Sequence, residues 1–136
     1  MELNINSPTY YTDVYGIDDD IYRLCQDMYM YFKDRHYSKV IDTIGIIPII
    51  APTETFEKGT CKEVKHCFVA AGFADVNLAI DYKTYVEADM EEKKSLIVKN
   101  VVDSVKAIKT RGKIDFKHFI EDMICFCDSH GVKYLS

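Results

Sequence analysis

The sequence predicts a single α+β domain over residues 1–136, with an antiparallel sheet of about four strands and three helices on one face. Apolar residues recur at helical spacing in three segments, and two other segments alternate apolar with polar residues as strands do. Hydrophobic residues make up 48% of the chain, which is enough for one core. No internal repeat or long linker divides the chain, and the expected element order is β-α-β-β-β-α-α.

The first part of the chain is expected to form a strand and then a helix. Leu3 and Ile5 alternate with polar residues, which favours a short strand. A helix is expected over residues 17–35, because its apolar residues fall on one stripe. Asp18 to Asp20 would occupy the first turn, where carboxylates are favoured by the helix dipole. The stripe consists of Ile17, Ile21, Leu24, Cys25, Met28, Tyr31 and Phe32.

Residues 40–50 are rich in isoleucine and predict a buried strand or strand pair. Gly45 and Pro48 would mark a bulge or an edge within it. Residues 52–59 are more polar, and we expect them to connect this strand to the next one.

Residues 63–71 and 75–88 are expected to be two more strands, with a turn around Gly72. In the second of them Val76, Leu78 and the following apolar residues alternate with polar ones, so one face would be buried.

Two helices are expected in the C-terminal part. Asp89 can cap a helix that begins with two glutamates and ends at Gly112. Asp115 can cap another helix that ends at His130 and Gly131. The apolar stripe of the first helix consists of Ile97, Val101, Val105 and Ile108, and that of the second of Phe116, Phe119, Ile120, Met123 and Cys127.

The composition indicates a cytoplasmic protein. The N-terminus lacks the basic and apolar regions of a secretory signal, and no apolar run is long enough to cross a membrane. The five cysteines are an odd number, and we expect them to be reduced.

The negative charge is concentrated in one half of the chain. The net charge is −5, and residues 1–60 hold five basic and ten acidic residues, whereas residues 61–136 hold twelve of each. Seven of the ten tyrosines lie within the first 37 residues. This distribution argues against direct binding to nucleic acid and favours a partner with a basic surface.

No pattern of reactive side chains predicts catalysis, a metal or a cofactor. Cys125 and Cys127 would point to opposite sides of a helix and could not bind one zinc ion together. Cys67 and His66 are neighbours on an expected strand and would face opposite sides. The run Asp18 to Asp20 lacks the glycine and glutamate of a calcium-binding loop. We therefore expect no catalytic residue, no metal site and no cofactor.

Part of the sequence resembles a known bacterial family. The segments are DVNLAIDYKTYVEAD (75–89), EEKKSLIVKNVVDSVKAIK (91–109) and FKHF (116–119). They are similar to immunity protein 44, a family from polymorphic toxin systems, and the resemblance covers about residues 62–125. It implies a cytoplasmic antidote that binds and blocks a cognate toxin without catalysis.

Three functions remain open at this point: a toxin-binding immunity protein, a small enzyme with an unrecognised site, or a structural adaptor subunit. The first is favoured, with a nuclease as the toxin, because a nuclease needs a basic groove for phosphates. Carboxylates would steer such a partner, and tyrosines would anchor it. The predicted contact residues lie on two flanks of the first helix: Asp20, Asp27 and Asp34 on one, and Asp18, Tyr22 and Tyr29 on the other.

Overall fold

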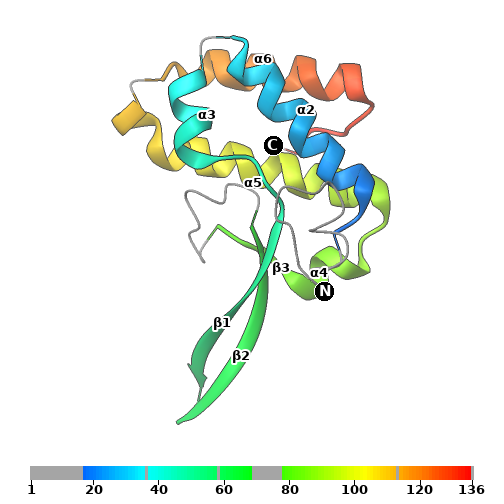
Figure 1. Ribbon diagram of the computed structural model, residues 1–136, viewed down its shortest axis with the longest axis vertical. Coiled ribbons are helices and arrows are strands. Elements are labelled where there is room, and N and C mark those ends of the chain that lie inside the picture. The colour runs from blue at the N-terminus through cyan, green and yellow to red at the C-terminus, as the bar shows by residue number, and fades with distance from the viewer. Residues whose placement is uncertain (1–16, 36, 58, 69–77, 113, 136) are drawn as a thin grey trace, which may run out of the picture.

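The computed structural model describes residues 17–35, 37–57, 59–68, 78–112 and 114–135 (Figure 1). Most of this part of the chain is helical, and its helices pack around one apolar core, while a long hairpin projects away from them. The predicted α+β fold, with an antiparallel sheet of about four strands supporting three helices, is therefore wrong. The expected first strand around Leu3 and Ile5 lies outside the described residues.

Helix α2 (Asp19–Lys33) confirms the helix expected over residues 17–35. Asp19 and Asp20 occupy its first turn, and Lys33 its last turn, as the helix dipole favours. Most of the predicted stripe is buried, so the opposite side of the helix faces solvent. The buried residues within α2 are Ile21, Leu24, Cys25, Met28 and Phe32.

Residues Ser38–Ile44 form helix α3, so the strand predicted to begin at residue 40 is wrong at its start. Val40 and Ile41 are both buried, and helix α3 packs against α2 and against α5 (Met90–Gly112). A strand would place these two neighbours on opposite faces, whereas a helix can turn both toward the core. Packing therefore overrides the preference of isoleucine and valine for strands.

The hairpin consists of β1 (Ile49–Glu57) and β2 (Thr60–Phe68), which pair antiparallel along their full lengths. The predicted connection over residues 52–59 is thus a strand for most of its length, and the predicted strand over 63–71 is confirmed up to Phe68. The chain reverses next to Gly59, whose φ of 79° suits glycine. The turn expected around Gly72 lies outside the described residues.

The predicted strand over residues 75–88 is wrong in its second half. Within its described residues, 78–88, β3 (Ile80–Asp81) alone pairs with β2, and helix α4 (Tyr82–Glu87) follows at once. The Asp81 carboxylate accepts a hydrogen bond of 3.0 Å from the backbone N–H of Thr84. This cap begins a helix where apolar alternation alone indicated a strand.

Helix α5 begins as predicted, because the backbone N–H of Glu92 donates a hydrogen bond of 2.8 Å to the Asp89 carboxylate. Its predicted apolar stripe is buried, and Val101 and Val105 are fully so. None of the described helices, α5 included, combines the length and apolar character needed to cross a membrane.

Helix α6 (Phe116–His130) also follows the prediction. The Asp115 carboxylate accepts a hydrogen bond of 3.1 Å from the backbone N–H of His118. Gly131, with a φ of 66°, ends the helix in the left-handed conformation that glycine tolerates best.

An aromatic cluster holds α2 against α6 and the start of α3. The ring of Phe32 lies 4.7 Å from the ring of Phe119, 5.5 Å from Tyr37 and 6.5 Å from Phe126, measured between centroids. These rings are buried, so the contacts fix the orientation of α2 about its own axis. The side of α2 that faces solvent is therefore set by the core.

Candidate protein-binding surface

The solvent-facing side of α2 borders an open groove of about 690 Å³. Helix α2 forms one wall, and α3 with the segment after it forms the other. The fully buried Ile41 and the nearly buried Ile46 contribute to its lining. The full lining consists of Tyr22, Gln26, Asp27, Tyr29, Met30, Ile41, Asp42, Gly45, Ile46 and Ile47.

A hydrogen bond across this groove joins its two walls. The Tyr29 hydroxyl donates to the Asp42 carboxylate at 2.9 Å and accepts from the Lys33 ammonium at 3.1 Å. The hydrogen bond from Lys33 to Tyr29, together with the nearby Asp42, raises the pKa of the Lys33 ammonium. The three side chains thus form a short polar chain with one cation and one carboxylate.

The structure brings three of the six predicted contact residues together. Tyr22, Asp27 and Tyr29 all line the groove. Asp27 also approaches α6, where its carboxylate lies 3.7 Å from Nε2 of His130.

The other three predicted residues lie outside the lining of the groove. Asp20 is exposed in the first turn of α2, and Asp34 is exposed just after its last turn. Asp18 is half-buried, and its carboxylate accepts a hydrogen bond of 3.0 Å from the Lys93 ammonium of α5. Asp18 therefore helps to hold α2 on α5.

The prediction from sequence missed Met30, Asp42 and Ile47, which also line the groove. Met30 offered a signal, because it is an apolar residue on the polar side of a predicted helix. Asp42 and Ile47 carried no such signal, because residues 40–50 were predicted to form a buried strand.

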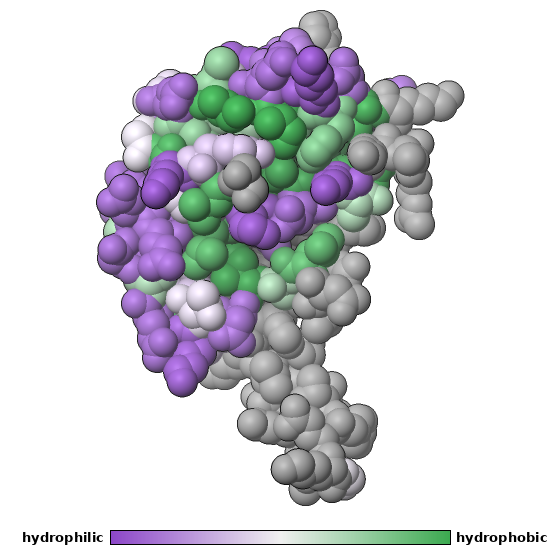
Figure 2. Space-filling model, turned by 180° about the vertical axis from the view of Figure 1, so that it is seen from behind, coloured by the Kyte–Doolittle hydropathy of each residue, from purple (hydrophilic) through white to green (hydrophobic). Residues whose placement is uncertain are grey.

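Apolar surface is not confined to this groove. Figure 2 shows the molecule from behind, and apolar side chains extend across the middle of that face between polar ones. The groove is distinguished by the kinds of side chain that line it, because apolar, acidic and tyrosine residues all contribute. That mixture is typical of protein-binding surfaces rather than of a bare apolar patch.

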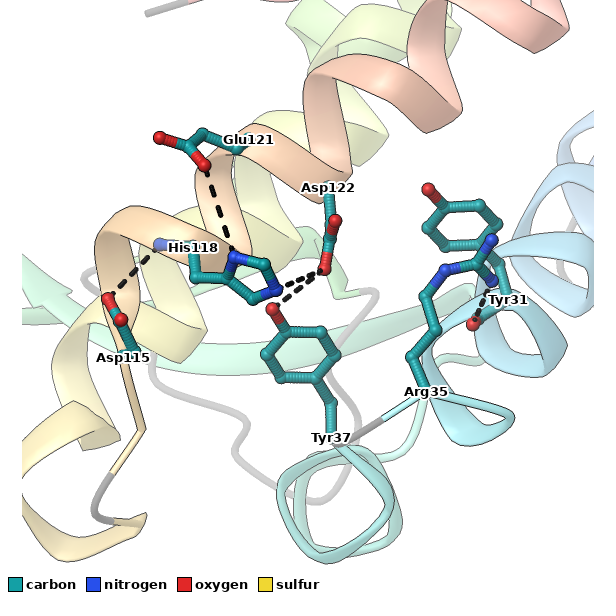
Figure 3. A network of polar contacts seen from close by, with 7 residues as sticks. All are labelled: Tyr31, Arg35, Tyr37, Asp115, His118, Glu121 and Asp122. Atoms are coloured by element: carbon teal, nitrogen blue, oxygen red, sulfur yellow. Dashed lines mark hydrogen bonds and ion pairs between the residues drawn. The ribbon is translucent and has the colours of Figure 1, made fainter.

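A second polar cluster links α3 to α6 (Figure 3). The Tyr37 hydroxyl donates a hydrogen bond of 2.8 Å to the Asp122 carboxylate, and Nε2 of His118 lies 3.5 Å from the same carboxylate. Burial, and then the bond to Asp122, raise the pKa of the Tyr37 hydroxyl.

The exposed thiol of Cys125 follows His118 by seven positions on α6, a rise of about 10 Å. The His118 ring is therefore too far away to take a proton from that thiol directly.

Among the described residues, no three His, Cys, Asp or Glu side chains are grouped so that they could hold a metal ion. Among the described cysteine side chains, Cys25, Cys125 and Cys127, none is in a disulfide bond. Burial raises the pKa of the Cys127 thiol to about 11, so this group stays protonated at neutral pH and is a poor nucleophile. The side chains of Cys61 and Cys67 lie outside the described part of the chain.

Comparison with known proteins identifies the family. A family model described as immunity protein 44 matches residues 1–129, which confirms the resemblance seen in the C-terminal half and extends it over the first 60 residues. No curated protein and no solved structure matches the chain. Because the match covers nearly the whole sequence, this chain belongs to the immunity protein 44 family.

Proposed function

We propose that this protein neutralises a cognate toxin by binding it with the solvent-facing side of α2. The contact surface would include the predicted residues Asp18, Asp20, Tyr22, Asp27, Tyr29 and Asp34. The observation that supports this choice most is the groove beside α2, where tyrosines, carboxylates and exposed apolar residues lie together. Tyrosines bring large contact areas with few rotatable bonds, and such residues dominate the binding energy of many interfaces.

The toxin in this proposal is a nuclease, and neutralisation occurs by covering its active site. A nuclease must present positive charge to phosphates, and the net charge of −5 on this chain is complementary to such a groove. Long-range attraction would speed the capture of the toxin before it reaches nucleic acid. This role requires no catalytic group and no cofactor in the antidote itself.

The packing of α2 suits tight binding. The Phe32 ring is locked among other aromatic rings, and Lys93 pairs with Asp18 at the beginning of the helix. A surface that is already ordered loses little conformational entropy on association, so more of the contact energy is retained as affinity.

The test uses the toxin domain that we expect to be encoded beside the gene of this chain, as the proposed function implies. We expect cells that produce the domain to stop growing, and growth to be restored when this chain is produced with it. Purified chain and domain should form a stable complex in titration calorimetry, and the complex should lose the activity of the toxin on nucleic acid. Toxicity that persists despite production of the folded chain would overturn the proposal. Protection from a toxin that does not act on nucleic acid would overturn the nuclease assignment alone.

A further inference from the structure

Two of the large apolar side chains exposed in the described part of the chain line the same groove. Met30 is 54% exposed and Ile47 is 39% exposed, and both belong to the lining. The comparably exposed Val86 and Ile124, at 50% and 38%, lie outside that lining. Apolar surface left in water at a groove is a feature of binding sites rather than of the core.

The backbone around Gly45 explains why Ile47 is exposed. The N–H of Gly45 donates a hydrogen bond of 2.8 Å to the carbonyl of Ile41 and ends α3. Gly45 then adopts a φ of 62°, which side chains other than glycine rarely allow. After this turn Ile46 enters the core at 3% exposure, whereas Ile47 stays at the surface. The exposure of Ile47 on the wall of the groove is thus a product of local backbone geometry.

The charge on the lining of the groove is negative. Asp27 contributes a carboxylate whose side chain is 59% exposed, and the exposed Asp42 contributes another. The Asp42 carboxylate is held in place by the hydroxyl of Tyr29. Lys33 is the cation bonded to that hydroxyl, and it lies outside the lining of the groove.

We infer that this groove receives a segment of the cognate toxin in which a lysine or arginine lies next to an apolar residue. The inference rests on the proposed function and adds the location and chemistry of the contact. The apolar residue packs between Met30 and Ile47. The cationic end approaches Asp27 and Asp42, while its aliphatic stem contacts the tyrosine rings. The occupant follows from charge complementarity, because the two carboxylates of the lining would repel an acidic segment, and a purely apolar segment would take water from them without supplying a hydrogen-bond donor.

Two matched pairs of variants test the apolar contact. Met30→Lys is compared with Val86→Lys, and Ile47→Lys with Ile124→Lys, so that each pair has nearly the same native exposure and the same charge change. The probe is the toxin domain encoded beside the gene, and affinity is measured by titration calorimetry. Each groove variant should bind about tenfold more weakly or worse, because it removes an apolar contact and repels the toxin's cation. Each control should change affinity by less than about twofold.

A third comparison tests the charge. Asp27→Asn with Asp42→Asn keeps the size of both side chains, and its control is Glu121→Gln with Asp128→Asn on α6, which changes the net charge equally. The groove variant should bind several-fold more weakly at low salt, and its affinity should depend less on salt than that of the parent chain. The control should retain the affinity and salt dependence of the parent. Circular dichroism and melting temperature confirm that every variant is folded.

The outcomes separate the two proposals. If the parent chain binds the toxin and the folded groove variants bind equally well, the groove is not the contact and the proposed function stands. If Met30→Lys or Ile47→Lys strengthens binding, the occupant is acidic and this inference is wrong. If the folded parent chain does not bind the toxin at all, both the function and the groove assignment are overturned.

Discussion

The hydroxyl of Tyr37 donates a hydrogen bond of 2.8 Å to the carboxylate of Asp122, a residue 85 positions later in the chain. This bond joins the beginning of α3 to α6, and the Tyr37 ring packs edge-on against Phe119 at 5.3 Å. Helix α3 supplies one wall of the groove, so the position of that wall depends on a contact between two residues that do not line the groove themselves.

Removal of this hydroxyl should lower stability. Tyr37→Phe leaves the Asp122 carboxylate without its partly buried donor and should reduce the free energy of unfolding by about 1 kcal/mol. Tyr29→Phe removes an exposed hydroxyl and should cost less than about 0.5 kcal/mol. Urea denaturation measures both values. Equal stability of Tyr37→Phe and the parent chain would show that the bond contributes nothing.

The apolar stripe of α5 gives a second prediction. Val101 is fully buried, so Val101→Ala should lower the free energy of unfolding by about 2 kcal/mol through lost burial and a residual cavity. Lys99 is exposed and pairs with Asp103 at 2.9 Å, so Lys99→Ala should cost less than about 0.5 kcal/mol. Thermal and urea unfolding measure both. Similar losses for the two variants would mean that α5 packs with another face.

The Cys127 thiol predicts a loss of stability in alkali. Its pKa is raised by burial from the ordinary 9.0 to about 11 in the folded protein. Because the thiol holds its proton more tightly in the folded protein than in the unfolded chain, its protonated form stabilises the fold. The contribution is therefore complete below pH 9 and is lost as the pH rises toward about 11. Between these values the free energy of unfolding should fall by about 1 kcal/mol per pH unit because of this group.

Cys127→Ala isolates this effect. The variant should lose less stability than the parent chain between about pH 8 and pH 10.5, whatever its stability at neutral pH. The Tyr37 hydroxyl acts with the same sign, so part of the slope should remain. If the free energy of unfolding of Cys127→Ala falls with pH as steeply as that of the parent chain, the Cys127 thiol is not the group responsible.

Alkylation followed by peptide mapping should also label the exposed Cys125 before the buried Cys127.

Reversal of charge on α2 should slow the capture of the toxin. Asp20→Lys with Asp27→Lys should lower the association rate, and more so at low salt, where exposed charges are least screened. Glu121→Lys with Asp128→Lys makes the same change in net charge on α6 and should slow association less. Stopped-flow mixing with the toxin domain at two salt concentrations measures both. Equal rates for the two double variants would mean that the total charge matters, and not its position on α2.

Tyr29→Ala should act on dissociation instead. The ring of Tyr29 lines the groove, and its loss should cost about 2 kcal/mol of binding free energy if it is an anchor. The variant also loses the hydrogen bond to Asp42, which Tyr29→Phe removes while the ring is kept. Slower association with an unchanged dissociation rate would contradict the role of an anchor.

The candidate site could be predicted from the sequence only on α2. Tyr22, Asp27 and Tyr29 were identified there because helical spacing places residues on faces without reference to the rest of the chain. The opposite wall, with Asp42 and Ile47, could not be predicted. It exists only because α3 packs against α2 and because Gly45 turns the chain at the end of α3.

By itself, the sequence determined the long helices α2, α5 and α6 and the family of the protein. Apolar stripes and the capping residues Asp89, Asp115 and Gly131 are local signals, and each acts within a few turns of helix. Tertiary structure decided between helix and strand at residues 38–44, whereas at residues 82–87 the local cap by Asp81 also favours the helix. Short apolar segments satisfy both periodicities, so burial against neighbouring elements selects one of them. The same packing decided which carboxylates, tyrosines and apolar side chains share a groove.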